Sequence, residues 1–217
     1  MAKIIGIVQL KGGAGRSTIA TNLAAALSRK GATAIIDCDM PQGTSASWYA
    51  LREADGKVYQ LTLGTAGSHV ELLTQIQRLE DQKYIVLDAP PRIAEMTRAI
   101  LMMADLLLIP LTPSAAEIWA TTDLLGTIEE ARQARPDLKA RIVWNKYRQQ
   151  TRSAQELSTA VKQELKISAL KNKLGYRVGY SEALARGLAG DEWPDKNTKA
   201  EIQALTTEIE KLTRGTI

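Results

Sequence analysis

A glycine-rich segment near the start of the chain carries the residue types that point most directly to chemistry. It reads Lys11-Gly-Gly-Ala-Gly-Arg-Ser-Thr18 and lies between a short apolar run and a segment with helical spacing. Glycines permit unusual backbone dihedrals and close approach to a ligand, and N–H groups at a helix N-terminus attract anions. We therefore expect a phosphate-binding loop in which the phosphates are cradled by Gly12, Gly13, Ala14, Gly15, Arg16, Ser17 and Thr18. The hydroxyl of Ser17 can also bind Mg²⁺.

This loop departs from the standard phosphate-binding pattern G-x-x-x-x-G-K-[ST] in two places. The opening glycine of the pattern is Gln9 or Leu10 here, and its lysine is Arg16. Arginine keeps the positive charge, but its guanidinium is longer, planar and bidentate, so it cannot simply take the place of a lysine ammonium. We expect the loop still to bind its phosphate ligand, with slow turnover.

The elements that must position this loop are those of an α/β fold. Five continuous runs rich in Ile, Val and Leu, typical of parallel strands covered on both faces, span residues 3–9, 33–37, 84–88, 106–111 and 140–145. Helical spacing is seen at residues 17–30, 117–132, 154–164 and 199–212. This alternation predicts a mostly parallel, twisted sheet with helices on both faces. No linker or repeat interrupts the chain, so we expect residues 1–217 to form a single domain.

Two of these runs end in acidic segments. The first segment reads Asp37-Cys-Asp39-Met-Pro-Gln-Gly, and the second reads Asp88-Ala-Pro-Pro91. Ligands of open parallel sheets bind at the carboxyl ends of the strands, where both segments and the glycine-rich loop are expected. The three segments together resemble the ParA/MinD family of ATPases, which has a deviant phosphate loop K-G-G-x-G-K-[ST] and elements of the form D-x-D-P-Q-G-[NS] and D-x-P-P. The short chain is similar to the small ParA type, including ParF.

The resemblance implies ATP and Mg²⁺ as cofactors and gives catalytic roles to three residues. Lys11 is expected to reach the phosphates of a partner subunit across a nucleotide-sandwich dimer. Asp39 is expected to orient the attacking water. Arg16 stands where the family pattern has lysine, so we expect ATP to bind and its hydrolysis to be slow.

Further residues are expected to hold the metal and the nucleotide. Ser17 is assigned to Mg²⁺, with Asp88 in the inner or outer shell of the ion. Asp37 is assigned either to the Mg²⁺ shell or to anchoring its own loop. Asn145 is similar in position to the residue that holds adenine in the family, and capping of a strand-to-helix turn is an equal alternative.

Positive charge is concentrated in the last third of the chain. The net charge is +4, but residues 1–138 hold 13 Lys and Arg against 15 Asp and Glu, whereas residues 139–217 hold 15 against 9. In small ParA-like proteins, the region near the C-terminus is described as binding DNA non-specifically. The resemblance therefore makes residues 139–200 a candidate DNA-binding surface, with Lys171, Lys173, Arg177, Arg186, Lys196 and Lys199 as contacts. An ordinary solvated charged face is the alternative for any single one of them.

Amino-acid composition indicates the cellular compartment and excludes some classes of protein. Hydrophobic residues make up 45% of the chain and charged residues 24%, as in globular proteins. The single cysteine, Cys38, disfavours an iron–sulfur redox protein and fits a reducing cytoplasm. No run approaches the ~20 apolar residues of a membrane span. We therefore expect a cytoplasmic protein without a membrane partner, and the resemblance to the ParA/MinD family implies that it is nucleoid-associated.

The resemblance implies an ATP-switched positioning ATPase. Such a protein forms a homodimer with ATP, binds duplex DNA, and is released when a ParB-like or cargo-adaptor protein stimulates hydrolysis. The cargo is a plasmid, a chromosome region or a protein assembly such as a carboxysome. Two alternatives stay open: an amide-forming synthetase of the cobyrinate or dethiobiotin type, and a MinD-like membrane ATPase. The second would need a basic amphipathic C-terminal helix, whereas residues 201–212 carry three glutamates.

Overall fold

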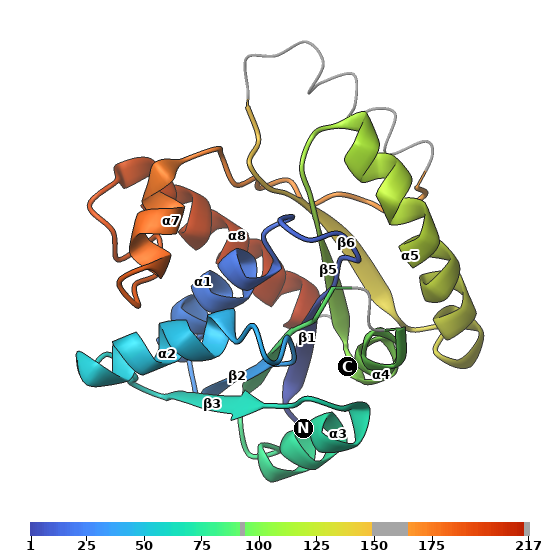
Figure 1. Ribbon diagram of the computed structural model, residues 1–217, viewed down its shortest axis with the longest axis horizontal. Coiled ribbons are helices and arrows are strands. Elements are labelled where there is room, and N and C mark those ends of the chain that lie inside the picture. Colours follow the sequence, from blue (N-terminus) through green and yellow to red (C-terminus); the bar gives the residue numbers. More distant parts are fainter. Residues whose placement is uncertain (92–93, 149–164, 215–217) are drawn as a thin grey trace.

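Six parallel strands form one sheet in the order β3-β2-β4-β1-β5-β6 (Figure 1). The structure is a computed structural model, and it describes residues 1–91, 94–148 and 165–214. The strands are β1 (Lys3–Ile7), β2 (Thr33–Asp37), β3 (Leu61–Thr65), β4 (Tyr84–Asp88), β5 (Leu106–Leu111) and β6 (Lys139–Trp144). The five strands predicted from the sequence are all present. Strand β3, at one edge, was not predicted.

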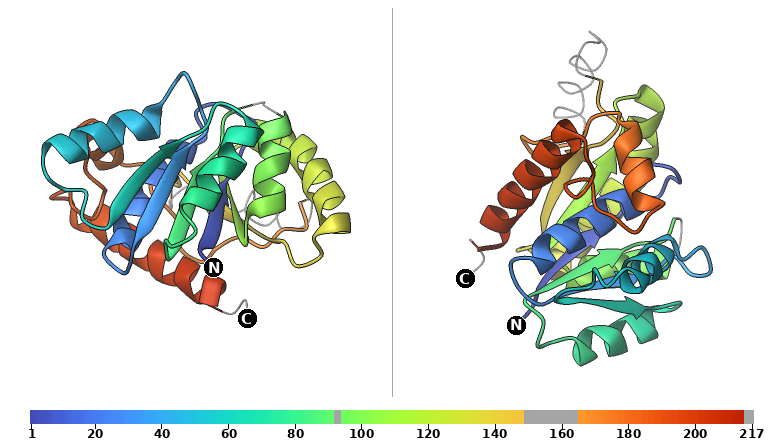
Figure 2. Two further views of the ribbon diagram at one scale, coloured as in Figure 1. Left: turned by 90° about the horizontal axis from the view of Figure 1, so that it is seen from below. Right: turned by 90° about the vertical axis from the view of Figure 1, so that its left-hand side faces the viewer.

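Helices cover both faces of the sheet, which confirms the predicted α/β architecture (Figure 2). On one face lie α1 (Arg16–Ser28), α2 (Thr44–Ala54), α7 (Val178–Leu184) and α8 (Lys196–Arg214). On the other lie α3 (His69–Arg78), α4 (Ala94–Met103) and α5 (Ala115–Ala134). The predicted helix at residues 154–164 lies outside the described residues.

Strand β4 shows how the sequence builds this layered core. Tyr84 and Val86 pack with the helix layer that contains α1, whereas Ile85 and Leu87 pack with the layer that contains α4. Successive side chains of a strand point to opposite faces, so a strand covered on both sides must be apolar throughout. Its four apolar residues are almost completely buried, as the continuous apolar run predicted.

Helix α8 is amphipathic, and its apolar face is buried. Ile202, Leu205 and Ile209 pack in the same core as α1, beside which α8 runs (Figure 2). The apolar face of this helix is therefore used within the core of the protein. None of the helices in residues 1–91, 94–148 and 165–214 has the length and apolar character needed to cross a membrane.

The strand order brings three loops together at one edge of the sheet. Strand β4 lies between β1 and β2, and Asp88 at its end is in register with both Ile7 of β1 and Asp37 of β2. The glycine-rich loop follows β1, and the segment that contains Asp39 follows β2. The sheet topology therefore brings the three sequence segments together at the carboxyl ends of β1, β2 and β4, as predicted.

Candidate nucleotide-binding site

The glycine-rich loop joins β1 to the start of α1 and has the backbone geometry of an anion cradle. Gly13 and Gly15 have φ values of +79° and +93°, which favour glycine. A Cβ at Gly12 or Gly13 would meet no atom within 4 Å. No side chain caps the first turn of α1. Its N–H groups can therefore bind an anion, as a nucleotide phosphate requires.

Arg16 is the first residue of α1, and its guanidinium is used mainly within the protein. Its Nε donates to the carbonyl oxygen of Ala89 at 2.8 Å, and Nη1 donates to the carbonyl oxygens of Gln9 at 2.6 Å and Lys11 at 2.8 Å. The other terminal nitrogen, Nη2, lies 3.8 Å from Oδ2 of Asp39. Arg16 thus ties the loop to the end of β4, with one nitrogen left toward Asp39.

The surroundings of Arg16 change its own pKa and that of Asp39. Burial lowers the pKa of Arg16, although the carboxylates of Asp88 and Asp39 raise it. Burial raises the pKa of Asp39, which the charge of Arg16 opposes and that of Asp37 reinforces. The two residues are therefore electrostatic partners at the edge of the loop, although 3.8 Å is too long for a hydrogen bond.

Asp37 anchors the backbone that follows β2. Its Oδ1 accepts a hydrogen bond from the N–H of Asp39 at 3.0 Å, and its Oδ2 accepts one from the N–H of Ala46 at 2.9 Å. Asp37 is completely buried. Because both oxygens already bind backbone donors, the arrangement favours the loop-anchoring alternative over a place in a Mg²⁺ shell.

Asp88 is also completely buried, and one of its oxygens is left without a partner. Its Oδ2 accepts a hydrogen bond from the Ser45 hydroxyl at 2.7 Å, while Oδ1 has no hydrogen-bond partner among the described residues. Burial raises the pKa of Asp88 to about 7, although the hydroxyls of Ser45 and Ser17 lower it. A carboxylate oxygen beside a serine hydroxyl is a donor set that suits Mg²⁺. Ser17 and Asp88 therefore fit the metal.

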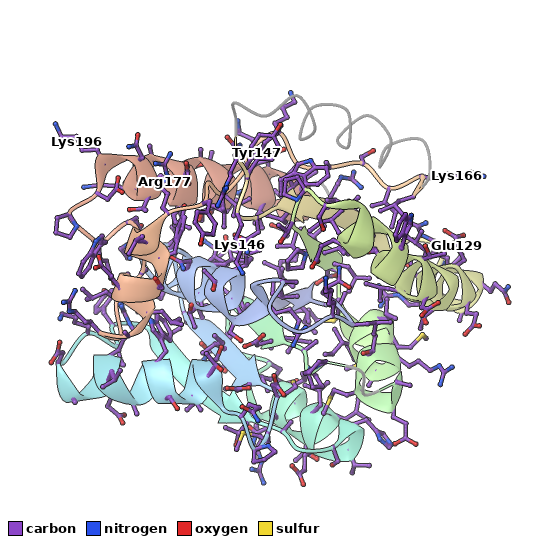
Figure 3. The ribbon with its side chains drawn as sticks, turned by 45° about the horizontal axis from the view of Figure 1, so that its top comes forward. Glu129, Lys146, Tyr147, Lys166, Arg177 and Lys196 are labelled. Carbon is purple, nitrogen blue, oxygen red and sulfur yellow. The ribbon has the colours of Figure 1, made fainter. Side chains whose placement is uncertain are left out.

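Asn145 and Lys146, which follow β6, hold the loop from its other side. Asn145 Nδ2 donates to the carbonyl oxygen of Ala14 at 2.8 Å, and its Oδ1 accepts from the N–H of Lys146. Lys146 has a φ of +52°, and its Nζ donates to the carbonyl oxygen of Gly13 at 2.8 Å. Figure 3 shows Lys146 beside the start of α1. The site prediction omitted Lys146, although its place at the carboxyl end of a strand was a signal for it.

Glu117 is a second residue that the sequence did not single out. It lies in the first turn of α5, and its Oε1 is 2.7 Å from Nζ of Lys11. Acidic residues are common in the first turn of a helix, so its presence there gave no sign of this contact. The structure thus brings Lys11 to an acidic partner within its own chain.

A family model described as ATPase MipZ matches residues 3–178 of this chain. The chain belongs to this ATPase family. It is 29% identical over 189 residues to maintenance of carboxysome distribution protein A of Halothiobacillus neapolitanus, covering 85% of each protein. It is 29% identical over 178 residues to the chromosome partitioning protein ParA of Myxococcus xanthus, covering 64% of this chain and 62% of that one.

Solved structures support the same fold. A structure of apo McdA from Cyanothece has a TM-score of 0.78 at 17% identity, and the match covers 96% of this chain and 100% of that one. The MipZ-family chain is thus a P-loop ATPase of the ParA/MinD type. Among structures of the same fold, one of an McdA variant from Cyanothece contains ATP, and one of cobyrinic acid a,c-diamide synthase from Mycobacterium smegmatis contains ADP and magnesium. The family, fold class and enzyme class expected from the sequence are confirmed.

The basic residues that were predicted to contact DNA in this MipZ-family protein lie around α7 and α8, and several are partnered within the chain. Arg177 donates from Nε and Nη2 to Oε1 of Glu201, at 2.9 and 2.7 Å. The Lys173 ammonium lies 3.9 Å from the ring centre of Tyr147. Figure 3 shows Arg177 and Lys196 on the side of the molecule away from Glu129 of α5.

The remaining predicted DNA contacts are spread along the same region. Lys196 and Lys199 lie in the first turn of α8, and the Arg186 guanidinium lies 4.6 Å from the ring centre of Trp193. Lys171 precedes them and binds Glu208 of α8 through its N–H. The carboxylates of Glu201 and Glu208 lie among these cations, so part of the positive charge is offset where DNA contacts were expected.

Proposed function

We propose that this protein is a ParA-type positioning ATPase with a single ATPase domain, residues 1–217. The observation that carries the proposal is the meeting of three strand ends, which places the phosphate loop against the buried carboxyl group of Asp88 and beside Asp39. The similarity to a carboxysome distribution protein and to a chromosome partitioning protein supports positioning as the use of that site.

The residues of the site divide the chemistry among them. The N–H groups of residues 12–18 bind the phosphates. Ser17 and Asp88 would hold Mg²⁺, which would neutralise charge on the transferred phosphoryl group. Asp39 orients the attacking water. Lys11 neutralises phosphate charge across a homodimer. Asn145 fixes the loop through Ala14, and its place at the loop also allows the predicted contact with adenine.

The proposed partners are duplex DNA and an adaptor protein. In the dimer, the surface around α7 and α8 binds DNA without sequence preference, through Lys171, Lys173, Arg177, Arg186, Lys196 and Lys199. A ParB-like or cargo-adaptor protein stimulates hydrolysis and so releases the dimer. The protein is then cytoplasmic and nucleoid-associated, and its cargo is a DNA molecule or a protein assembly.

Retention on DNA tests this function and separates it from the synthetase alternative. We expect the protein to bind a non-specific duplex with ATP and Mg²⁺ and to elute with ADP or without nucleotide. A variant that lacks the carboxyl group, Asp39→Ala, should stay bound longer because hydrolysis is slowed. Equal binding in all nucleotide states, or none in any, would contradict the proposal.

A further inference from the structure

The ion pair between Lys11 and Glu117 connects the phosphate loop to α5. Its Nζ to Oε1 distance is 2.7 Å, and the two side chains are 40% and 10% exposed. A second link lies beside it, because Gln9 Nε2 donates to the Thr121 hydroxyl at 3.1 Å and that hydroxyl donates to the Glu117 carbonyl oxygen at 2.7 Å. The main chain of Glu117 is therefore held within α5 and its side chain is largely buried, whereas the side chain of Lys11 is far more exposed.

Apart from the pair with Lys11, little compensates the negative charge of the Glu117 carboxylate. Its Oε2 is buried and has no hydrogen-bond partner among the described residues. A buried carboxylate that loses its cation is strongly unfavourable, since neither solvent nor another charge replaces it. Any movement of Lys11 away from its own chain must therefore overcome the loss of this pair.

We propose that Glu117 is a positioning residue that holds Lys11 within the separate protomer and thereby sets how much ATP is needed for two protomers to pair. This inference rests on the proposed function, in which Lys11 acts across the dimer. Lys11 cannot lie on Glu117 and on a partner's phosphates at once, so its transfer opposes pairing. The pair thus keeps protomers apart at low ATP.

Glu117→Gln tests the inference because it removes the charge and keeps the size of the side chain. Freed from the pair, Lys11 should support dimers at lower ATP, and we expect the midpoint to fall by at least about fivefold, the lower end of coupling between linked sites. The midpoint is measured by sedimentation velocity across an ATP series with Mg²⁺. Glu129→Gln is the matched control, since Glu129 lies on the same helix, is exposed and pairs with Arg132.

A second variant shows whether the effect passes through Lys11. In the Lys11→Ala background, Glu117→Gln should leave the midpoint unchanged. Thermal unfolding of each variant checks that it is folded. An unchanged midpoint in Glu117→Gln, or an equal shift in the Lys11→Ala background, overturns the inference.

Chemical labelling detects the Lys11–Glu117 ion pair in the protomer, in the absence of nucleotide and of a dimer. An ammonium held by a carboxylate reacts slowly with an acetylating reagent, so acetylation of Lys11, followed by mass spectrometry, should be several-fold faster in Glu117→Gln than in the parent protein or in Glu129→Gln. Equal rates overturn the inference.

The outcomes also separate the inference from the proposed function. If the parent protein does not dimerise with ATP, the proposed function fails as well. If it dimerises and Glu117→Gln has no effect, the inference alone fails.

Discussion

The Nε atom of Arg16 donates to the carbonyl oxygen of Ala89 at 2.8 Å and so joins the phosphate loop to the end of β4. Ala89 follows Asp88, the proposed Mg²⁺ residue, directly in the chain. Arg16 also holds the carbonyl oxygens of Gln9 and Lys11. An arginine at this position therefore stabilises the shape of the site, and only Nη2 is left to face a phosphate.

Arg16→Lys should separate these two roles. A lysine cannot reproduce all three carbonyl contacts. A hydrogen bond from a charged group contributes about 1.5–3 kcal/mol, so the loss of even one should lower the free energy of unfolding by about 2 kcal/mol. The compact ammonium suits the phosphate oxygens, so hydrolysis should be faster. The ATP affinity of Arg16→Lys should stay within about tenfold of that of the parent protein, because the N–H groups of the loop still bind the phosphates.

The measurements are urea unfolding, steady-state phosphate release and calorimetric titration with a non-hydrolysable ATP analogue. Arg29→Lys is a control on the same segment, since Arg29 is partly exposed and pairs with Asp191 outside the site. A fall in ATP affinity of more than about a hundredfold would show that Arg16 is itself the main phosphate ligand.

Asn145→Ala should weaken nucleotide binding by loosening the loop. The change removes the bond to the Ala14 carbonyl oxygen and the one to the Lys146 N–H. Two neutral hydrogen bonds contribute about 1–3 kcal/mol together, so ATP affinity should fall by about 5- to 150-fold. Asn172→Ala is the control, because Asn172 binds Glu208 and Ala204 instead of the loop. Equal affinities in the two variants would argue against a role of Asn145 in the site.

Ser17→Ala should remove the contribution of Mg²⁺ while leaving nucleotide binding in EDTA unchanged. The Ser17 hydroxyl is a proposed ligand, and loss of metal-site groups costs at least about tenfold in metal affinity. Titration with Mg²⁺ at fixed ATP measures this directly. Ser28→Ala is the matched control on the same helix, since the Ser28 hydroxyl donates to the Ala25 carbonyl oxygen, outside the proposed metal site. The assignment fails if Ser17→Ala and Ser28→Ala respond alike to Mg²⁺.

Lys199→Gln should reduce DNA binding more than Arg177→Gln does. Lys199 makes no ion pair with another residue of the described ranges, whereas the charge of Arg177 is matched by Glu201. Each phosphate contact contributes about −0.9 to the slope of log K against log salt. The slope for Lys199→Gln should therefore be less negative than that of the parent protein by nearly this amount. Salt titrations of DNA binding with ATP and Mg²⁺ give the slopes. A larger change for Arg177→Gln would reverse the proposed map of the surface.

Glu192 should make the protein more stable at neutral than at acid pH. Burial alone would raise its pKa, but hydrogen bonds from Arg52 and the Ala189 N–H, together with the charges of Arg52 and Arg29, hold the pKa below its ordinary value. The native state then binds fewer protons than the unfolded state, so this stability is present above the unfolded pKa of about 4.3 and is lost as pH falls through the lower native pKa.

The measurement for Glu192 is the free energy of unfolding against pH. Glu192→Gln should reduce the loss of stability below about pH 4.3, the ordinary value for glutamate, relative to the parent protein. Asp191 next to it has a raised pKa and acts in the opposite direction, so only the difference between the two proteins is informative.

The sequence predicted the parts of this molecule that depend on contiguous residues. Strands β1 and β4 are continuous apolar runs, and the loop and Asp88 belong to short motifs at their ends. Strand β3 was missed because Leu-Thr-Leu-Gly-Thr is short, half exposed and contains glycine. Alternation of this kind is weak over five residues.

The missing parts of the site depend on residues far apart in the sequence. Lys11 meets Glu117 and Arg16 meets Ala89 only because β4 and β5 flank β1 in the sheet, an order that the apolar runs do not specify. The sequence also could not show that the charge of Arg177 is paired with Glu201, because that contact depends on the fold. Residue types predicted the chemistry, and topology decided which charges meet.

Sedimentation velocity with ATP and Mg²⁺ tests the central claim most directly, because the proposed function requires two protomers to close across their phosphate loops. Asp39→Ala should slow hydrolysis and lengthen the lifetime of the dimer. The account predicts a single protomer of 23.7 kDa without nucleotide and twice that mass with ATP, reversed by ADP. A protein that hydrolyses ATP but stays at the protomer mass at every ATP concentration contradicts it.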